Sequence, residues 1–213
     1  MALCEPVELT LAEQLGEPGE RTEHVYFPTA SVVSLIAGLD TRHRVEVGMA
    51  GREGMVGVQV VLGLQHDPLH TIVQGAGTAL RVRAHDFRQE LARTAVLRDR
   101  LLHYVAVLMT QRAHAAACLR YHEIGPRLCR WLLMSRDRAG VNEFPVTQEW
   151  LAVMLGVRRV GITVAAGALQ QRGLIRYHRG HLTVIDPHGL QALACSCYAT
   201  DRQTYTEQMD ARA

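Results

Sequence analysis

The chain has 213 residues, of which 48% are hydrophobic, and its formal net charge is +2. This length suits one large domain or two modest ones, and no uncharged apolar run approaches the roughly 18 residues of a membrane span. Acidic Glu5 and Glu8 stand where a secretion signal would carry positive charge. Neither export nor membrane insertion is expected, and the protein is predicted to be cytoplasmic.

The N-terminal segment up to Arg83 contains short β-branched and aliphatic runs separated by glycine and proline. Regular short strands with such punctuation predict a β sandwich or jelly roll. Together with the helical patterns that follow, this makes the fold class α+β. The expected strands cover residues 25–27, 31–39, 44–47, 56–62, 71–73 and 78–83.

A helical period begins at Ala84 and continues to Leu119. From Leu101 onward its apolar positions are spaced alternately four and three apart, which is the spacing of a coiled-coil seam. One face of this helix is expected to pack on the β roll and another on a second subunit. Arg112 within the seam leaves an ordinary core helix as the alternative. The predicted dimerisation residues are Leu101, Val105, Leu108, Ala115 and Leu119, and a neighbouring face holds Leu102, Ala106, Met109 and Ala113.

The helical pattern breaks over residues 121–126, where Gly125 and Pro126 separate one helix from the next. We expect a hinge at this break. Two domains follow from it: residues 1–120, a β roll with a long helix over about 94–120, and residues 121–213.

A helix pair and a hairpin are predicted between Thr147 and Asp186. Thr147 is a good N-cap, Gly156 lies in the turn between the helices, and Arg179-Gly180 is the turn of a short hairpin. Such a helix, turn, helix and hairpin is typical of a DNA-binding winged helix-turn-helix, although any amphipathic helix pair joined by glycine gives a similar pattern. The residues expected to meet where the helices cross are Leu151, Leu155, Ile162, Ala166 and Leu169.

Basic charge is concentrated on this predicted winged helix-turn-helix. Residues 121–186 contain nine arginines against five acidic residues, whereas residues 1–120 contain twelve against thirteen. Arg158 and Arg159 open the second helix, where a recognition helix contacts base edges and phosphates. The local pattern therefore favours binding to double-stranded DNA.

Neither a metal site nor an enzyme is predicted. The five cysteines contain no CxxC pair, and Cys195-Ser196-Cys197 is interpreted as two half-buried thiols in preference to a redox pair or half of a metal site. The eleven histidines are interpreted as surface residues. No nucleophile elbow, P-loop, HExxH or dinucleotide-binding fingerprint is present, so no catalytic residue is assigned.

The order of β roll, long helix, hinge and winged helix resembles the Crp/Fnr superfamily of transcription regulators over nearly the whole chain. The motifs that carry the resemblance are Tyr26-Phe27-Pro28, Val45-Glu46-Val47-Gly48, Gly51-Arg52-Glu53-Gly54 and Thr147-Gln148-Glu149, with Leu155-Gly156-Val157. The resemblance implies a cyclic-nucleotide-binding-like sensor domain before residue 120 and a DNA-binding domain after it. The chain starts almost directly at its first expected strand, so an N-terminal helix common in such regulators is either missing or lies upstream of the given start.

The resemblance also places an effector pocket in the β roll. Cyclic-AMP-responsive members hold the sugar phosphate with a glutamate and an arginine, but here Val58-Gln59 follows Gly57, and Leu69-His70 stands where the arginine would be. Cyclic AMP would lack its charge-assisted partners, so it is not expected as the effector. The candidate ligand-binding residues are Gly57, Val58, Gln59, His70 and Thr71, with the alternative that the glycines only shape a turn.

Other effectors find little support in the sequence. An iron–sulfur cluster is not expected, because such members need several N-terminal cysteines and only Cys4 is present. Haem ligands cannot be assigned. A cyclic dinucleotide is left as an alternative effector. The cations available near the roll to bind it are Arg42, Arg44, Arg52 and Arg81.

The DNA contacts implied by the resemblance fall on the helix pair and the wing. Arg159 aligns with the family arginine that reads a guanine, while Val160 and Val164 replace a glutamate and a second arginine. We expect a homodimer on a pseudo-palindromic site. The resemblance also implies contact with RNA polymerase. The alternative function is a small-molecule or cyclic-dinucleotide sensor acting through protein–protein contacts. The predicted DNA-binding residues are Thr147, Gln148, Arg158, Arg159, Val160, Thr163 and Arg179.

Overall fold

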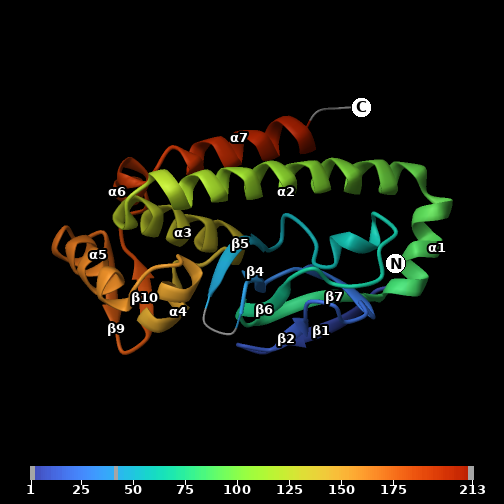
Figure 1. The fold of residues 1–213 in the computed structure, drawn as a ribbon, viewed down its shortest axis with the longest axis horizontal. Helices are drawn as coiled ribbons and strands as arrows, with labels where there is room; N and C mark the ends of the chain where they lie inside the picture. Colours follow the sequence, from blue (N-terminus) through green and yellow to red (C-terminus); the bar gives the residue numbers. More distant parts are fainter. Residues whose placement is uncertain (1–2, 41–42, 211–213) are drawn as a thin grey trace.

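A computed structural model describes residues 3–40 and 43–210 (Figure 1). Its N-terminal half is a roll of two antiparallel sheets. The first sheet has the order β1-β7-β3 and the second has the order β2-β6-β4-β5. The strands are β1 (Glu5–Leu9), β2 (Gln14–Gly16), β3 (His24–Pro28), β4 (Val32–Gly38), β5 (Arg44–Ala50), β6 (His70–Gly75) and β7 (Gly77–Arg83). Arg42, one of the cations considered for a cyclic dinucleotide, lies outside the described residues.

The prediction of a strand over 56–62 is wrong. Val56 forms only an isolated bridge with Tyr26, and a short 3₁₀ helix, η1 (Val58–Val60), follows. Gly57 lies between them with a φ of 88°, in the left-handed region that breaks an extended run. A Cβ at Gly57 would also lie 3.0 Å from Cγ1 of Val25, so glycine is needed for close approach as well as for the turn.

The long helix is two helices, α1 (Ala84–Arg93) and α2 (Ala95–Tyr121). In Figure 1, α2 lies across the β roll and α7 (Cys197–Met209) runs beside it on the other side. The roll-facing side of α2 packs in one core with Val25, Met55 and Phe87, through Leu101, Tyr104 and Leu108. The side facing α7 carries Gln111, His114 and Cys118, which contact Asp201 or Cys195.

Most of the predicted dimerisation residues are buried within the single chain, and their role in a dimer stays a prediction. Leu101, Val105, Leu108 and Ala115 are only 9%, 8%, 3% and 8% exposed within a single chain, and Leu119 is half-buried. A side chain that already packs inside its own chain offers little surface to a partner. The face next to it is exposed, with Leu102 at 40% and Met109 at 66%. This exposed face repeats the four-three spacing and consists of Leu102, Ala106, Met109, Ala113 and Ala116.

A short break separates α2 from α3 (Ile124–Ala139), which leads into the C-terminal part. The break is shorter than the expected 121–126 segment, because Gly125 and Pro126 already lie in the first turn of α3. The remaining elements are β8 (Glu143–Pro145), α4 (Gln148–Met154), α5 (Arg159–Gln171), β9 (Ile175–His178), β10 (His181–Val184), α6 (Pro187–Leu193) and α7. Strands β8, β10 and β9 form a small antiparallel sheet in that order.

The two parts of the chain share one core. Val32, Ile36 and Met49 of the roll pack in the same cluster as Leu128 and Leu132 of α3. Nε1 of Trp131 donates to a Glu46 carboxylate oxygen over 3.0 Å. The division between residues 120 and 121 lies in the last turn of α2, just before the helix break, and stays a prediction. Among the described residues, no single helix is long and apolar enough to cross a membrane, and only the bent pair α4 and α5 meets that test jointly.

Candidate nucleic-acid interface

Helices α4 and α5 form the predicted helix-turn-helix. The chain bends by 108° between them, within the range of about 90–120° for this motif. Gly156 occupies the turn with a φ of 60°, and the hydroxyl of Thr147 caps α4 by accepting from the backbone N–H of Trp150 over 3.1 Å. The five residues expected at the crossing are all buried, which confirms that prediction: Leu151, Leu155, Ile162, Ala166 and Leu169.

The outer face of α5 is exposed. Arg158 is the N-cap and Arg159 the first helical residue, and both are exposed. Val160 and Val164 are 66% and 70% exposed. Their exposure agrees with an outward position on α5, because Ile162 and Ala166 turn the other side of the helix inward. Two apolar side chains thus lie on a surface beside two arginines.

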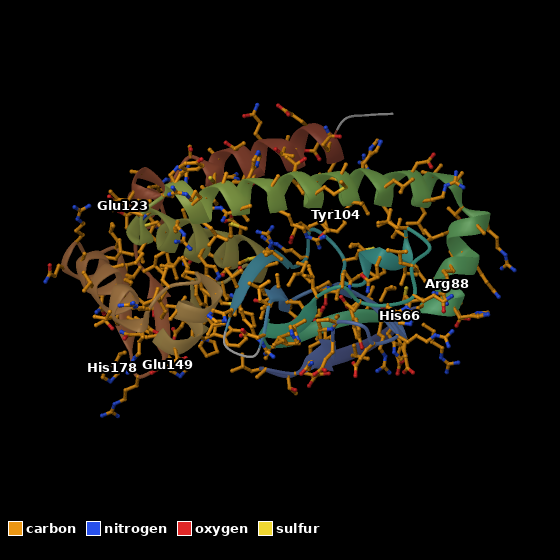
Figure 2. The ribbon with its side chains drawn as sticks, in the orientation of Figure 1. His66, Arg88, Tyr104, Glu123, Glu149 and His178 are labelled. Carbon is orange, nitrogen blue, oxygen red and sulfur yellow. The ribbon has the colours of Figure 1, made fainter. Side chains whose placement is uncertain are left out.

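Hydrogen bonds tie this face to α4. Oγ1 of Thr163 donates to Oε1 of Gln148 over 2.7 Å. Nε of Arg159 lies 3.0 Å from a Glu149 carboxylate oxygen, an ion pair that the sequence did not predict. Figure 2 shows Glu149 at the end of the molecule that carries the winged helix. Both partners are about two-thirds exposed, at 65% and 63%, so a ligand that competes for Arg159 displaces a weak pair.

The wing lies beside the helix pair. Arg179 and Gly180 have φ values of 47° and 78°, which is the two-residue turn of a tight hairpin and confirms the predicted turn. The hydroxyl of Tyr177 donates to the carbonyl of Val146 over 2.8 Å and fixes β9 to the segment before α4. One open cleft brings together four of the seven predicted DNA-binding residues, namely Thr147, Gln148, Arg159 and Arg179.

The predicted effector residues surround a small cavity between the roll and α2. Gly57, Val58, Gln59 and Thr71 line it, with Val105 and Leu108 opposite, whereas His70 lies outside it on β6. Its volume is 120 Å³, well below the roughly 300 Å³ at which pockets for drug-sized ligands begin. In this conformation the cavity is too small for a nucleotide.

The arginine in the predicted seam is half-buried and interacts electrostatically with a buried aspartate. Arg112 lines the same cavity, and burial lowers the pKa of its guanidinium while the charge of Asp67 acts against that shift. Burial raises the pKa of Asp67, whose carboxylate accepts from the backbone N–H of Leu69 over 3.0 Å and from the Thr71 hydroxyl over 3.3 Å. Arg112 therefore belongs to the pocket wall.

Residues 126–193 match the family model of the Crp-like helix-turn-helix domain. The chain contains a Crp-like helix-turn-helix domain. The domain spans α3 to α6 and carries the exposed face of α5 described above. A search of curated proteins finds no match.

Solved structures with the same fold extend the likeness to nearly the whole chain. FixK2 from Bradyrhizobium japonicum is 12% identical with a TM-score of 0.72, covering 91% of this chain and 98% of its own. A regulator of the CRP family from Thermus thermophilus, TTHB099, is 17% identical with a TM-score of 0.69, covering 88% and 96%. CLP of Xanthomonas campestris, described as c-di-GMP responsive, is 15% identical with a TM-score of 0.60, covering 86% and 94%. The predicted α+β fold and the resemblance to the Crp/Fnr superfamily are confirmed.

A second group of side chains was not predicted as a site. Cys118, His122, Cys195 and Cys197 gather where α2 ends and α7 begins. The signal that could have found them is the pair Cys118 and His122, four residues apart at the end of one helix. The hydrogen bond from the Cys118 thiol lowers the pKa of Cys195 to about 6, while the pKa of Cys118 is raised.

Proposed function

We propose that the protein is a sequence-specific DNA-binding transcriptional regulator of Crp/Fnr type, acting in the cytoplasm as a homodimer on a pseudo-palindromic site. The observation that supports this most directly is the exposed outer face of α5, with Arg158 and Arg159 at its start and the wing beside it. No catalytic role is proposed. RNA polymerase is a further proposed partner, since a regulator bound beside a promoter acts through it.

The chemistry of α5 suggests how it reads DNA. The guanidinium of Arg159 can donate two parallel hydrogen bonds to O6 and N7 of a guanine once it leaves Glu149. Val160 and Val164 offer exposed methyl groups for contact with thymine. Thr147 and Gln148 at the start of α4 and Arg179 at the tip of the wing are placed for phosphate contacts, which set affinity and register.

Substituting Arg159 tests the base contact. Arg159→Ala is expected to weaken binding by about 1–3 kcal/mol at the operator, with the preference for guanine relaxed at one base position. The measurement is fluorescence anisotropy on the upstream DNA of its own gene, on single-base variants of that DNA and on scrambled DNA, across a salt series.

Arg172→Ala is the matched control, because Arg172 is an exposed arginine at the other end of α5. It should change affinity little and leave the base preference intact. An equal loss on every sequence from Arg159→Ala would make it a phosphate contact. Binding without salt dependence would favour the alternative, a sensor acting through protein–protein contacts.

The homodimer is proposed to form along the exposed face of α2 in place of the buried seam. Leu102 and Met109 are its largest side chains, and the alanines between them allow two helices to approach closely. Joined along this face, two copies would place their α5 helices in successive major grooves about 34 Å apart.

A charge on this face tests the dimer. Met109→Glu is expected to raise the dimer dissociation constant at least tenfold, because two carboxylates would face each other at the helix crossing. Val96→Glu is the control, since Val96 is 82% exposed on α2 but lies off this face. Sedimentation velocity over a concentration series measures both. A wild-type chain that stays monomeric, or an equal effect of Val96→Glu, would contradict the proposal.

Cyclic AMP is not proposed as the effector. The cavity of 120 Å³ is too small for it, and Val58-Gln59 and Leu69-His70 occupy the positions where cyclic-AMP-responsive members have their glutamate and arginine. A cyclic dinucleotide is not proposed either, since the described cations considered for it, Arg44, Arg52 and Arg81, do not line this cavity and Arg81 is paired with Glu5 at 2.8 Å.

A further inference from the structure

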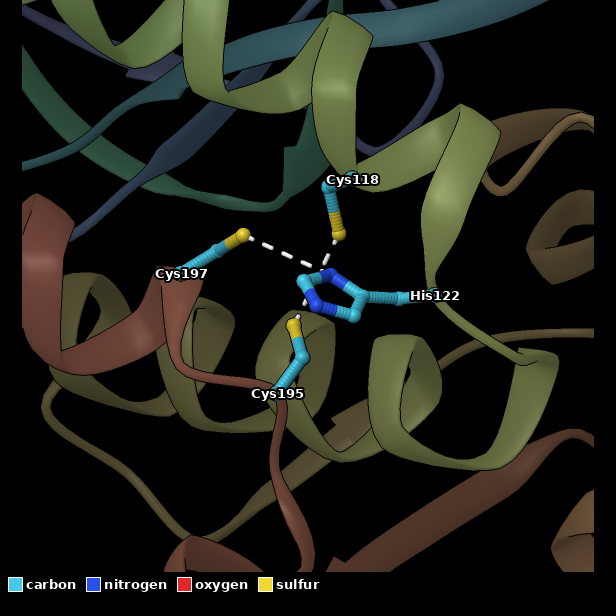
Figure 3. A group of neighbouring side chains, drawn as sticks. All are labelled: Cys118, His122, Cys195 and Cys197. Atoms are coloured by element: carbon cyan, nitrogen blue, oxygen red, sulfur yellow. Dashed lines mark hydrogen bonds between the residues drawn. The ribbon is translucent and has the colours of Figure 1, made fainter.

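Three thiols and one imidazole meet at the junction of α2, α3 and α7 (Figure 3). Cys118 lies in the last turn of α2 and His122 caps the same helix. Cys195 precedes α7 and Cys197 is its first residue. Their four ligand atoms all lie within 4.8 Å of one another. Segments about 75 residues apart in the chain thus direct their soft ligand atoms at one point.

Two of the six distances between ligand atoms match the edges of a coordination tetrahedron, and the others lie within 4.8 Å. With metal–sulfur bonds of about 2.3 Å and a metal–nitrogen bond of about 2.0–2.1 Å, tetrahedral zinc requires about 3.8 Å between two sulfurs and about 3.6 Å between sulfur and nitrogen. The sulfurs of Cys118 and Cys195 lie 3.6 Å apart, and the Cys197 sulfur lies 3.6 Å from Nδ1 of His122. A disulfide would need about 2.05 Å. The four atoms are thus spaced for a shared central ion.

We propose that Cys118, His122, Cys195 and Cys197 bind one divalent metal ion of the zinc class in a closed tetrahedral site. Each thiol releases its proton to solvent as its sulfur bonds the ion, and the imidazole binds as the neutral base. Thiolate and imidazole ligands select zinc-class ions over magnesium and calcium, which prefer oxygen. A multi-iron cluster would need its ligands further apart, because they would bind different iron atoms.

The surroundings suit such an ion. A divalent ion with three thiolates and a neutral imidazole carries one excess negative charge, and the guanidinium groups of Arg127 and Arg130 act electrostatically on Cys118 and Cys195. Cys118 and Cys195 are 2% and 7% exposed, so the protein shields the ion from competing ligands. All four ligand positions come from the chain, and a site without an open position is structural and not catalytic.

The position of the site indicates what the ion would do. It joins the end of α2 to the start of α7, and Cys195 also donates its backbone N–H to the carbonyl of Pro126 in α3. Arg127 of α3 in turn donates to the carbonyl of Leu155, at the end of α4. An ion would fasten α7 across the junction between the roll and the helix-turn-helix.

The test is metal binding by the full-length protein. We expect purified protein to hold one zinc ion per chain by elemental mass spectrometry. Cobalt added to the protein stripped by a chelator should give the strong visible absorption of tetrahedral cobalt thiolate. Cys197→Ser and His122→Ala should each lower the affinity for zinc, measured against a chromophoric chelator, at least tenfold. Far-UV circular dichroism checks that each variant is folded.

Cys4→Ser and Cys129→Ser are matched controls, because both thiols lie outside the group and should leave affinity unchanged. An independent readout needs no variant: zinc should protect Cys197, which is more accessible than Cys118 and Cys195, from alkylation while Cys4 stays reactive. Absence of zinc binding, an equal loss in the Cys4→Ser variant, or alkylation unaffected by zinc would each overturn the proposal. None of these readouts depends on DNA binding.

Discussion

Replacing Asp201 with alanine is expected to destabilise the protein by about 3–5 kcal/mol, the cost of leaving a buried cation without its partner. The Asp201 side chain is 4% exposed on α7. It accepts from Arg130 of α3 over 2.6 Å and from Nδ1 of His114 of α2 over 2.9 Å. One carboxylate thus joins three helices. Urea unfolding in the presence of a chelator measures the change without a contribution from bound metal.

Two further substitutions are the controls for the effect of Asp201→Ala on stability. The Asp99 side chain is 63% exposed and forms an ion pair with Arg98. Asp99→Ala should change the free energy of unfolding by no more than about 0.5 kcal/mol. Asp201→Asn keeps the shape and loses the charge, so it should fall between the two. If Asp201→Ala resembled Asp99→Ala, the carboxylate would not be what holds α7 in place.

The second large effect is a pH dependence that comes from Glu46. Burial raises the pKa of its carboxyl to about 7 from a usual 4.5, against the opposing effects of the Ser34 hydroxyl and of Arg138, Arg130 and Trp131 on α3. Although the residue is partly exposed as a whole, its carboxyl lies between Ser34 at 2.6 Å and Trp131 at 3.0 Å. The raised pKa means that the folded state prefers the protonated acid.

The sign follows from that preference. Below pH 4.5 the acid is protonated in both states and its contribution is fully present, and it is lost as pH rises through about 7. The full loss is on the order of 3 kcal/mol. Glu46→Gln, which stays neutral, should therefore lose less stability than the wild type between pH 5 and pH 8 in urea unfolding. Glu143→Gln, at an exposed position on β8, is the control. An identical pH slope in Glu46→Gln and wild type would rule out this role.

The helix-turn-helix was predictable because its signals are local. The N-cap Thr147, the turn glycine Gly156 and the inward positions Leu151, Ile162 and Leu169 all lie within one short stretch, and helical periodicity alone assigns the inward face. The hairpin turn at Arg179 and Gly180 is equally local. Val160 was predicted to contact DNA, and its exposure, like that of Val164, agrees with an outward position on α5.

The fold class and the helix-turn-helix were therefore determined by the sequence itself, through turn residues and apolar periods that each act over a few neighbours. Tertiary structure decided which of two adjacent faces of α2 packs on the roll, because Leu101 and Leu102 have the same chemistry and only the positions of the roll and α7 distinguish them. Tertiary structure also brings Cys118 into contact with Cys195, which is 77 residues away in the chain. Local patterns carry no information about such distant pairs, since folding brings them together only when the helices between them have packed.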